Sequence, residues 1–161
     1  MLRQTRRALL RVSEVTKSRK NKHNIGKQQV KVREKQNKEV QVQFITYKHS
    51  KAPCSIAVPA AETACAWKAC KQYQLVAKQS ACYFTHRSGE PLTVSYVRKT
   101  LDKVLKLVGL NPTEYNTHSF RIGRATDMFK QGYTDAQICM AGRWNSKAYK
   151  KYIKPQILSF D

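Results

Sequence analysis

Acidic residues are scarce in this sequence. Ten Asp and Glu side chains stand against 31 Lys and Arg among 161 residues, which leaves a formal net charge of +21. This excess is far beyond what solubility requires and indicates a polyanionic partner, either nucleic acid or an anionic membrane surface. The first 51 residues carry 15 of the basic residues and three of the acidic ones, so the charge is concentrated early. The simplest alternative is a solvated basic surface on a ribosome-associated protein.

Long apolar runs are also missing. No stretch approaches the ~20 residues of a membrane-spanning helix. The basic N-terminus is not followed by the apolar segment and cleavage site of a signal peptide. We therefore expect an intracellular protein that does not enter a membrane. The sequence contains no internal repeat and no low-complexity tract.

Patterns typical of metal sites and disulfide frameworks are absent as well. The five cysteines include no CxxC pair, and the four histidines lack the spacing of zinc ligands. We therefore expect no metal and no cofactor, and reduced cysteines that pack as small apolar side chains. The cysteines are Cys54, Cys65, Cys70, Cys82 and Cys139.

The remaining composition is that of a globular domain. With 41% hydrophobic and 25% charged residues, the chain fits one domain over 1–161. Clustered apolar residues predict a helix over 2–16, followed by a basic loop. Period-two alternation predicts strands over 29–33 and 40–47, and a third strand over 54–59 that ends at Pro59. These strands predict a small antiparallel sheet near the N-terminal third.

Helical patterns dominate after the predicted strands. The first covers 60–78, with an inner face formed by Ala64, Trp67, Cys70 and Leu75. Further helices are expected over 93–108, 117–130, 134–140 and 145–155, with Gly109, Gly132, Gly142 and Pro155 as their stop signals. Tyr83 and Phe84 are expected to form a short buried extended piece. The predicted fold class is therefore α+β and mainly helical.

The string Thr117-His118-Ser119-Phe120-Arg121 contains the first residues with catalytic potential. Residues three apart share one face of a helix, so His118 and Arg121 are expected to point into the same space. A histidine can exchange a proton and an arginine can bind a phosphate, which makes the pair suitable for phosphoryl transfer. Alone it is weak evidence, because HxxR occurs often by chance.

Further candidate catalytic residues lie before and after this pair in the sequence. Arg11 lies on the first predicted helix, and Lys48 and Lys51 lie on the turn between the second and third predicted strands. Downstream come Gly142-Arg143-Trp144 and, ten residues after the glycine, Tyr152. This order and spacing resemble the tyrosine recombinase (phage integrase) family, over nearly the whole stretch 11–152. The strings GRW and HSFRIGRAT are most similar to the DIRS-like and Crypton-like recombinases of eukaryotic mobile elements.

The resemblance implies DNA strand cleavage and rejoining through a 3′-phosphotyrosine. Arg11 and Arg121 match the two arginines that bind the scissile phosphate, and His118 matches the acid–base residue. Tyr152 matches the nucleophile, and a lysine on the strand turn matches the general acid, for which we prefer Lys51 to Lys48. Tyr149 fits the spacing from Gly142 poorly and is expected to pack in the core.

One position departs from the common family pattern. Many relatives have His after the glycine of this motif, where the chain has Arg143 followed by Trp144. Either residue could donate a hydrogen bond to the phosphate, Arg143 by its guanidinium and Trp144 by its indole N–H. The alternative for Trp144 is a buried core aromatic. Glu14, one helical turn from Arg11, is expected to orient an arginine or a neighbouring backbone group.

The remaining N-terminal basic residues are expected to bind DNA phosphates without reading bases. The set comprises Arg7, Lys17, Arg19, Lys20 and Lys22. The run 17–22 also matches a nuclear localisation signal, which predicts a nuclear protein.

The resemblance also predicts partners and domain organisation. We expect double-stranded DNA as the partner, four protomers on two duplexes, and neither a membrane nor a small-molecule substrate. Family members carry a helical DNA-binding domain ahead of this region, so we expect 1–161 to be an N-terminally truncated catalytic domain. The alternatives are a degenerate or domesticated copy that binds DNA without cutting it, and an unrelated basic RNA-binding protein. A type IB topoisomerase would use a similar set of residues, but His118 and the short chain favour a recombinase.

Overall fold

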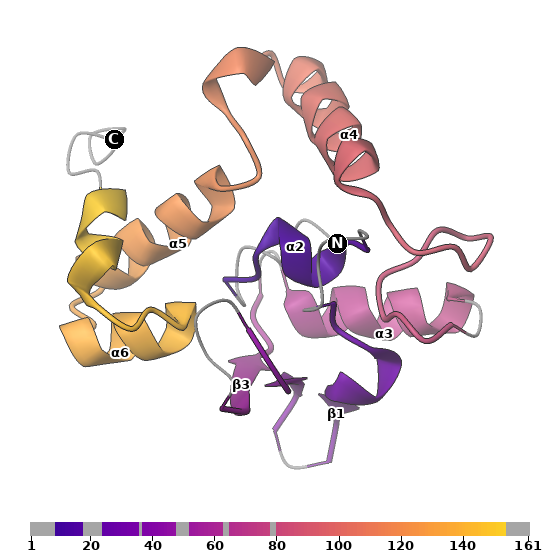
Figure 1. Ribbon diagram of the computed structural model, residues 1–161, viewed down its shortest axis with the longest axis horizontal. Coiled ribbons are helices and arrows are strands. Elements are labelled where there is room, and N and C mark those ends of the chain that lie inside the picture. The colour runs from indigo at the N-terminus through magenta and orange to yellow at the C-terminus, as the bar shows by residue number, and fades with distance from the viewer. Residues whose placement is uncertain are drawn as a thin grey trace.

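The computed structural model describes residues 9–17, 24–35, 37–47, 52–62, 65–77 and 80–153. It confirms the α+β class: helices stand on one side of a small antiparallel sheet (Figure 1). Within the described residues, no helix is both long and apolar enough to cross a bilayer.

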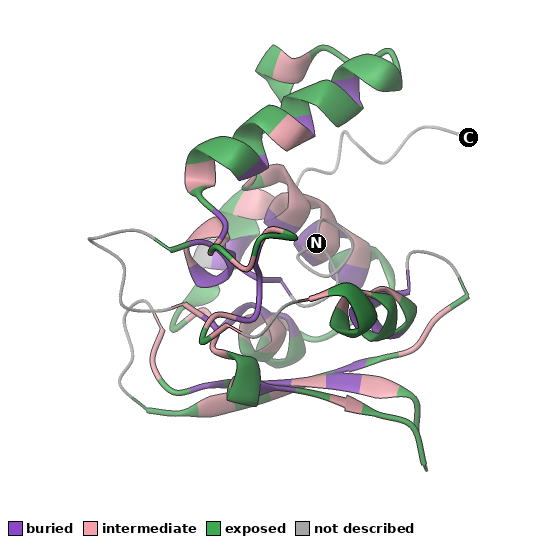
Figure 2. Cartoon of the chain, turned by 90° about the vertical axis from the view of Figure 1, so that its right-hand side faces the viewer, coloured by how far each residue is buried: buried purple, intermediate pink, exposed green. Residues whose placement is uncertain are grey.

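The sheet contains β1 (Val30–Arg33), β2 (Glu39–Phe44) and β3 (Cys54–Pro59) in the order β1-β2-β3. Both pairings are antiparallel, and Val40 stands opposite Val32 on one side and Val58 on the other. Alternation along β2 buries Val40, Val42 and Phe44, as the period-two pattern predicts. No described element covers the opposite face of the sheet (Figure 2).

The inner face of the sheet packs against α3 (Ala66–Val76) and forms the larger of two hydrophobic clusters. We call this group the N-terminal cluster. Its buried members are Leu10, Val15, Ile25, Val30, Val40, Val42, Phe44, Val58, Cys65, Ala66, Trp67, Cys70, Tyr83, Phe84, Leu92 and Val97.

Two predictions for this half are wrong in part. The helix predicted over 2–16 is limited, in its described part, to α2 (Val12–Val15), because Leu9 adopts a left-handed φ of 49° that no helix tolerates. Residues 1–8 lie outside the described part. The inner face of α3 contains Trp67 and Cys70, but Leu75 is 80% exposed and Tyr73 packs against the cluster instead.

Helix α4 (Val94–Leu107) follows the buried piece at Tyr83 and Phe84. It begins where the Thr93 side chain accepts from the Tyr96 N–H, and its end is followed by Gly109 at φ 74°. Both boundaries agree with the predicted signals. The helix projects beyond the rest of the molecule, and much of its surface is exposed (Figure 2).

The second hydrophobic cluster, the C-terminal cluster, joins α5 (Ser119–Lys130), α6 (Asp135–Gly142) and the 3-10 helix η3 (Lys147–Tyr152). Two further 3-10 turns, η1 (Lys27–Gln29) and η2 (Pro112–Glu114), precede β1 and α5. The buried members of the C-terminal cluster are Leu9, Ala125, Met128, Ile138 and Tyr149.

The C-terminal elements differ from the prediction at their ends. His118, not Thr117, is the N-cap of α5. Helix α6 runs through Gly142, and the left-handed residue that ends it is Arg143 at φ 53°. The last predicted helix is a 3-10 turn that ends at Tyr152, and the end predicted for it at Pro155 lies outside the described residues.

Candidate active site

Arg11 stands at the N-terminal end of α2 and contacts Glu14 one turn later. The carboxylate accepts from the Arg11 backbone N–H at 2.7 Å and from its guanidinium at 3.1 Å. The other guanidinium nitrogen donates to the Arg143 carbonyl at 3.4 Å. The expectation that Glu14 orients an arginine is therefore confirmed.

Arg121 is 1% exposed, although it carries a charge. Its guanidinium donates to the carbonyls of Leu9 and Gly142, the latter at 2.8 Å, and lies 4.6 Å from the centre of the Trp144 ring. Burial, with the nearby charges of Arg11 and Arg143, lowers the pKa of Arg121 to about 9. These contacts fix the guanidinium at the base of the site.

Arg143 is also buried, and it links three segments. Its guanidinium donates to Glu14 at 2.8 Å and to the Leu9 carbonyl at 3.3 Å, and lies 4.0 Å from the centre of the Phe44 ring. Burial lowers the pKa of Arg143, and the charge of Glu14 opposes that shift.

Trp144 follows the left-handed residue and turns back over α6. Its backbone N–H donates to the Cys139 carbonyl at 2.9 Å, and its ring lies against Gly142. A Cβ built on Gly142 would come within 1.8 Å of that ring, so this position requires glycine for close approach. The sequence analysis treated Gly142 as a helix stop and as part of the motif before Tyr152, but not as a site of close packing.

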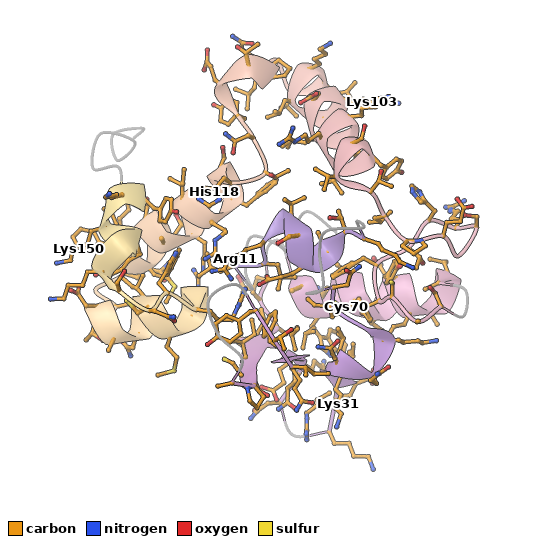
Figure 3. All side chains as sticks on the ribbon, in the orientation of Figure 1. Arg11, Lys31, Cys70, Lys103, His118 and Lys150 are labelled. Atoms are coloured by element: carbon orange, nitrogen blue, oxygen red, sulfur yellow. The ribbon has the colours of Figure 1, made fainter. Side chains whose placement is uncertain are left out.

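His118 and Tyr152 meet at the rim of the site. Their ring centres are 4.9 Å apart in an edge-to-face arrangement, and the Tyr152 ring lies 5.7 Å from that of Trp144. The Thr126 hydroxyl donates to the Tyr152 carbonyl at 3.3 Å, which ties η3 to α5. His118 faces the space that also receives Arg11 from α2 (Figure 3).

These side chains line one pocket of about 580 Å³, which we call the arginine pocket. Six of the predicted catalytic residues are brought together here. The lining comprises Arg11, Val12, Ser13, Thr117, His118, Arg121, Arg143, Trp144, Asn145, Ser146 and Tyr152. Lys48 and Lys51, the two candidates for the general acid, lie outside the described residues.

The charge of the arginine pocket suits an anion. Two of its three guanidinium groups, those of Arg11 and Arg143, pair with the Glu14 carboxylate, and that of Arg121 is held by carbonyls, which leaves a positive excess in a partly desolvated space. A phosphodiester gains negative charge on the way to a pentacovalent transition state, and fixed positive groups stabilise that gain. Among the described residues, no group of three or more His, Cys, Asp or Glu side chains is placed to hold a metal ion.

Tyr149 packs in the C-terminal cluster, as predicted. It is 0% exposed, and its hydroxyl donates to the Asp135 carboxylate. Desolvation and that carboxylate raise the pKa of Tyr149 to about 12, and its hydrogen bond lowers the pKa of Asp135. Tyr149 therefore does not line the arginine pocket.

The predicted DNA-backbone residues are placed only in part. Lys17 is exposed at the end of the α2 segment, and its backbone N–H donates to the Leu92 carbonyl. Arg7, Arg19, Lys20 and Lys22 lie outside the described residues.

Sequence reasoning missed several groups around the arginine pocket. Ser13, Thr117, Asn145 and Ser146 line it, and each stands within two residues of a side chain that the sequence analysis assigned to the site. The Leu9 carbonyl, which accepts from two arginines, left no sequence signal, because it depends on a left-handed leucine.

Comparison with solved structures shows a shared fold. The XerH site-specific recombinase bound to its difH substrate in a pre-cleavage complex matches with a TM-score of 0.68 at 13% identity, over 94% of this chain and 40% of that one. The post-cleavage complex of XerH matches with a TM-score of 0.69 at 13% identity, over 99% and 41%. The Tn1549 transposon integrase in complex with circular intermediate DNA matches with a TM-score of 0.64 at 12% identity, over 95% and 52%.

This chain thus spans 40 to 52% of the length of those structures. Among curated proteins, none matches it. The family model described as the phage integrase family matches residues 1–156. That match extends over nearly all of the sequence, and the chain therefore belongs to the phage integrase family.

Proposed function

We propose that this chain cuts and rejoins duplex DNA through a 3′-phosphotyrosine formed by Tyr152. The observation that carries the proposal is the convergence of Arg11, His118, Arg121 and Tyr152 on the arginine pocket. These residues come from three separate segments, α2, α5 and η3. The alternative of an unrelated RNA-binding protein predicts no such convergence, so the shared pocket supports the recombinase proposal over it.

In the proposed reaction, Arg11 and Arg121 bind the non-bridging oxygens of the scissile phosphate. Their planar guanidinium groups, charged at neutral pH, suit that geometry better than lysine would. The Tyr152 oxygen bonds to phosphorus, the bond from phosphorus to the 5′ oxygen breaks, and that oxygen receives a proton from the general acid. Rejoining reverses these steps without a nucleotide cofactor, because the phosphotyrosine keeps the energy of the broken phosphodiester.

His118 is proposed to exchange a proton with the reacting tyrosine, which fits the contact between their rings. For the additional phosphate donor, the contacts favour Trp144 over Arg143. The guanidinium of Arg143 is committed to Glu14 and the Leu9 carbonyl. The Trp144 indole N–H donates to no described residue, and the ring borders the arginine pocket.

The nucleophile is tested with a trapping substrate. A pool of randomised duplexes with a 5′-bridging phosphorothiolate at one fixed position releases a thiol that rejoins poorly, so the covalent complex accumulates. We expect a protein–DNA adduct from the wild-type chain and none from Tyr152→Phe, with Tyr133→Phe on the exposed surface as the matched control. An adduct that survives Tyr152→Phe would rule out the proposed nucleophile.

The same substrate distinguishes the two candidate lysines. A thiolate leaves without a proton, so loss of the general acid slows cleavage of an ordinary phosphodiester but not of the phosphorothiolate. We propose Lys51 as the general acid and expect this selective rescue for Lys51→Ala. If Lys48→Ala shows it instead, Lys48 takes the role.

A second candidate function is DNA binding without cleavage. It is favoured by one observation, the departure from the common family pattern after Gly142, where many relatives have His and this chain has Arg143. In that case salt-sensitive binding to duplex DNA would persist, and no adduct would form with any substrate of the pool.

Four expectations remain proposals. We propose that Arg7, Lys17, Arg19, Lys20 and Lys22 contact DNA phosphates, and that four protomers assemble on two duplexes. We also propose a nuclear location and an origin in a mobile element. The basic run 17–22 supports the nuclear location, and the similarity of the GRW and HSFRIGRAT strings to mobile-element recombinases supports that origin.

A further inference from the structure

The arginine pocket lies where the two hydrophobic clusters meet. Leu10 belongs to the N-terminal cluster and Leu9 to the C-terminal cluster, so two adjacent residues anchor different cores. The left-handed conformation of Leu9 lets these neighbouring side chains diverge. Arg11 reaches the pocket from the first side, and His118, Arg121 and Tyr152 reach it from the second.

The described elements that pack most closely on one another belong to the same cluster. Among the described elements, no helix or strand of one cluster packs extensively on an element of the other. A groove of about 380 Å³ runs between β3 and the pair formed by α5 and α6, bordered by Ile56, Met128 and Met140. The relative position of the catalytic groups therefore depends on the bonds that cross at the pocket.

Arg143 supplies most of those bonds. It belongs to the end of α6, yet its guanidinium pairs with Glu14 of α2 at 2.8 Å and lies against Phe44 of β2 at 4.0 Å. Its carbonyl accepts from Arg11 at 3.4 Å, so the same residue also holds the side chain of the first arginine.

The backbone of Arg143 adopts a conformation that favours other residue types. A left-handed residue after a helix is most favourable as glycine or asparagine, and a larger side chain costs about 1 kcal/mol or more there. Arg143 adopts this conformation at φ 53° and ψ 49°, and its side chain is also completely buried. The ion pair with Glu14 and the hydrogen bond to the Leu9 carbonyl partner the buried guanidinium, which would be an uncompensated buried charge without Glu14.

We infer that Arg143 is a positioning residue whose ion pair with Glu14 fixes the two hydrophobic clusters against each other and thereby sets the distance between Arg11 and the group of His118, Arg121 and Tyr152. The catalytic consequence of this inference rests on the proposed function. Its structural part is independent of that function. In this assignment Arg143 acts through Arg11 and Glu14 and does not touch the phosphate.

Hydrogen exchange tests the structural part without catalysis. The variants are Arg143→Asn, which keeps a residue that tolerates the left-handed turn, and Glu14→Gln. We expect each to accelerate amide exchange on both sides of the contact, in 9–17 and in 140–146, by about tenfold. Arg98→Asn, on the exposed surface of α4, serves as the matched control. Acceleration confined to the segment that carries the substitution would overturn the inference.

A neutral scissile group tests the catalytic part. Replacing the scissile phosphate by a methylphosphonate removes its negative charge and with it the need for an arginine that neutralises it. We expect Arg121→Ala to recover cleavage on the methylphosphonate duplex relative to the ordinary one, and Arg143→Asn to show no recovery. Equal recovery of both variants would make Arg143 a phosphate donor and overturn its positioning role.

The two parts fail in different ways. If the wild-type chain forms no adduct on any duplex, the proposed function fails, and hydrogen exchange still decides whether the ion pair joins the clusters. If the adduct forms but exchange in 9–17 is unchanged in Arg143→Asn, the proposed function stands and the positioning role is wrong.

Discussion

A buried arginine destabilises a protein unless its charge and its donors are satisfied, and Arg121 meets that condition only in part. Its Nε has no hydrogen-bond partner among the described residues. Two backbone carbonyls accept from its guanidinium and the Trp144 ring covers it. Burial, with the nearby charges of Arg11 and Arg143, lowers its pKa to about 9. Neither carbonyl neutralises the guanidinium charge, so an incoming anion is favoured. At the residue scale, the site is a cationic pocket in which backbone carbonyl oxygens hold the Arg121 guanidinium in place.

Gly142 provides a sharp test at this scale. In Gly142→Ala the new Cβ would overlap the Trp144 ring, so the ring must leave its place over Arg121. We expect the rate of adduct formation to fall at least about tenfold and the free energy of unfolding to fall by about 1–3 kcal/mol.

The matched control is Gly123→Ala in the middle of α5. A Cβ at Gly123 meets nothing within 4 Å, so the change should raise the free energy of unfolding by about 0.5–1 kcal/mol. Urea unfolding of both variants decides the comparison. A Gly142→Ala chain that matches the wild type in stability and cleavage would contradict the tight approach of the indole ring.

Element boundaries follow the sequence where a local signal is decisive. The Thr93 cap, Gly109 and the alternation of β2 each specify their element through contacts within a few residues. The fold class, the sheet and the order of helices were therefore predictable. Most residues of the arginine pocket were predictable as well, because the order and spacing of the sequence motifs identified them.

The predictions that failed depend on contacts far along the chain. Leu9 and Arg143 occupy left-handed conformations that their own side chains disfavour, and each is held there by partners more than 100 residues away. The pattern in α3 placed Leu75 inside because periodicity does not show where a core ends. The burial of Arg121 could not be predicted from the sequence either, because its hydrogen-bond acceptors are backbone carbonyls, which no residue type reveals.

The link between α6 and η3 predicts a specific dependence of stability on pH. The pKa of Tyr149 is raised to about 12 in the folded chain, above about 10 in an unfolded one. Its contribution is therefore fully present below pH 10 and is lost as pH rises from about 10 toward 12. Urea unfolding should show a steeper loss of stability in this window for the wild type than for Tyr149→Phe. Parallel pH profiles would mean that the hydrogen bond to Asp135 contributes nothing.

At the scale of the whole molecule, the net charge of +21 is expected to govern how DNA binding depends on salt. Binding to duplex DNA should weaken steeply as salt increases, because each neutralised phosphate releases a counterion. We expect Lys17→Ala to weaken binding similarly for every sequence and to reduce the slope of log K against log salt by about 1.

Lys103→Ala is the control for that measurement. Lys103 is exposed on α4, away from His118 and Arg11 (Figure 3), so its loss should leave the slope nearly unchanged. If both variants lower the slope equally, Lys17 makes no specific phosphate contact and the charge acts only as a diffuse field.

The central claim, that Tyr152 receives the DNA phosphate in a pocket built by two clusters, is tested most directly by locating the covalent bond. Lys150 and Lys151 lie between Tyr149 and Tyr152, so trypsin separates the two tyrosines into different peptides. After nuclease trimming of the trapped complex, mass spectrometry should find the residual nucleotide on the peptide that begins at Tyr152. A nucleotide on the peptide that contains Tyr149, or on any other peptide, would contradict the account.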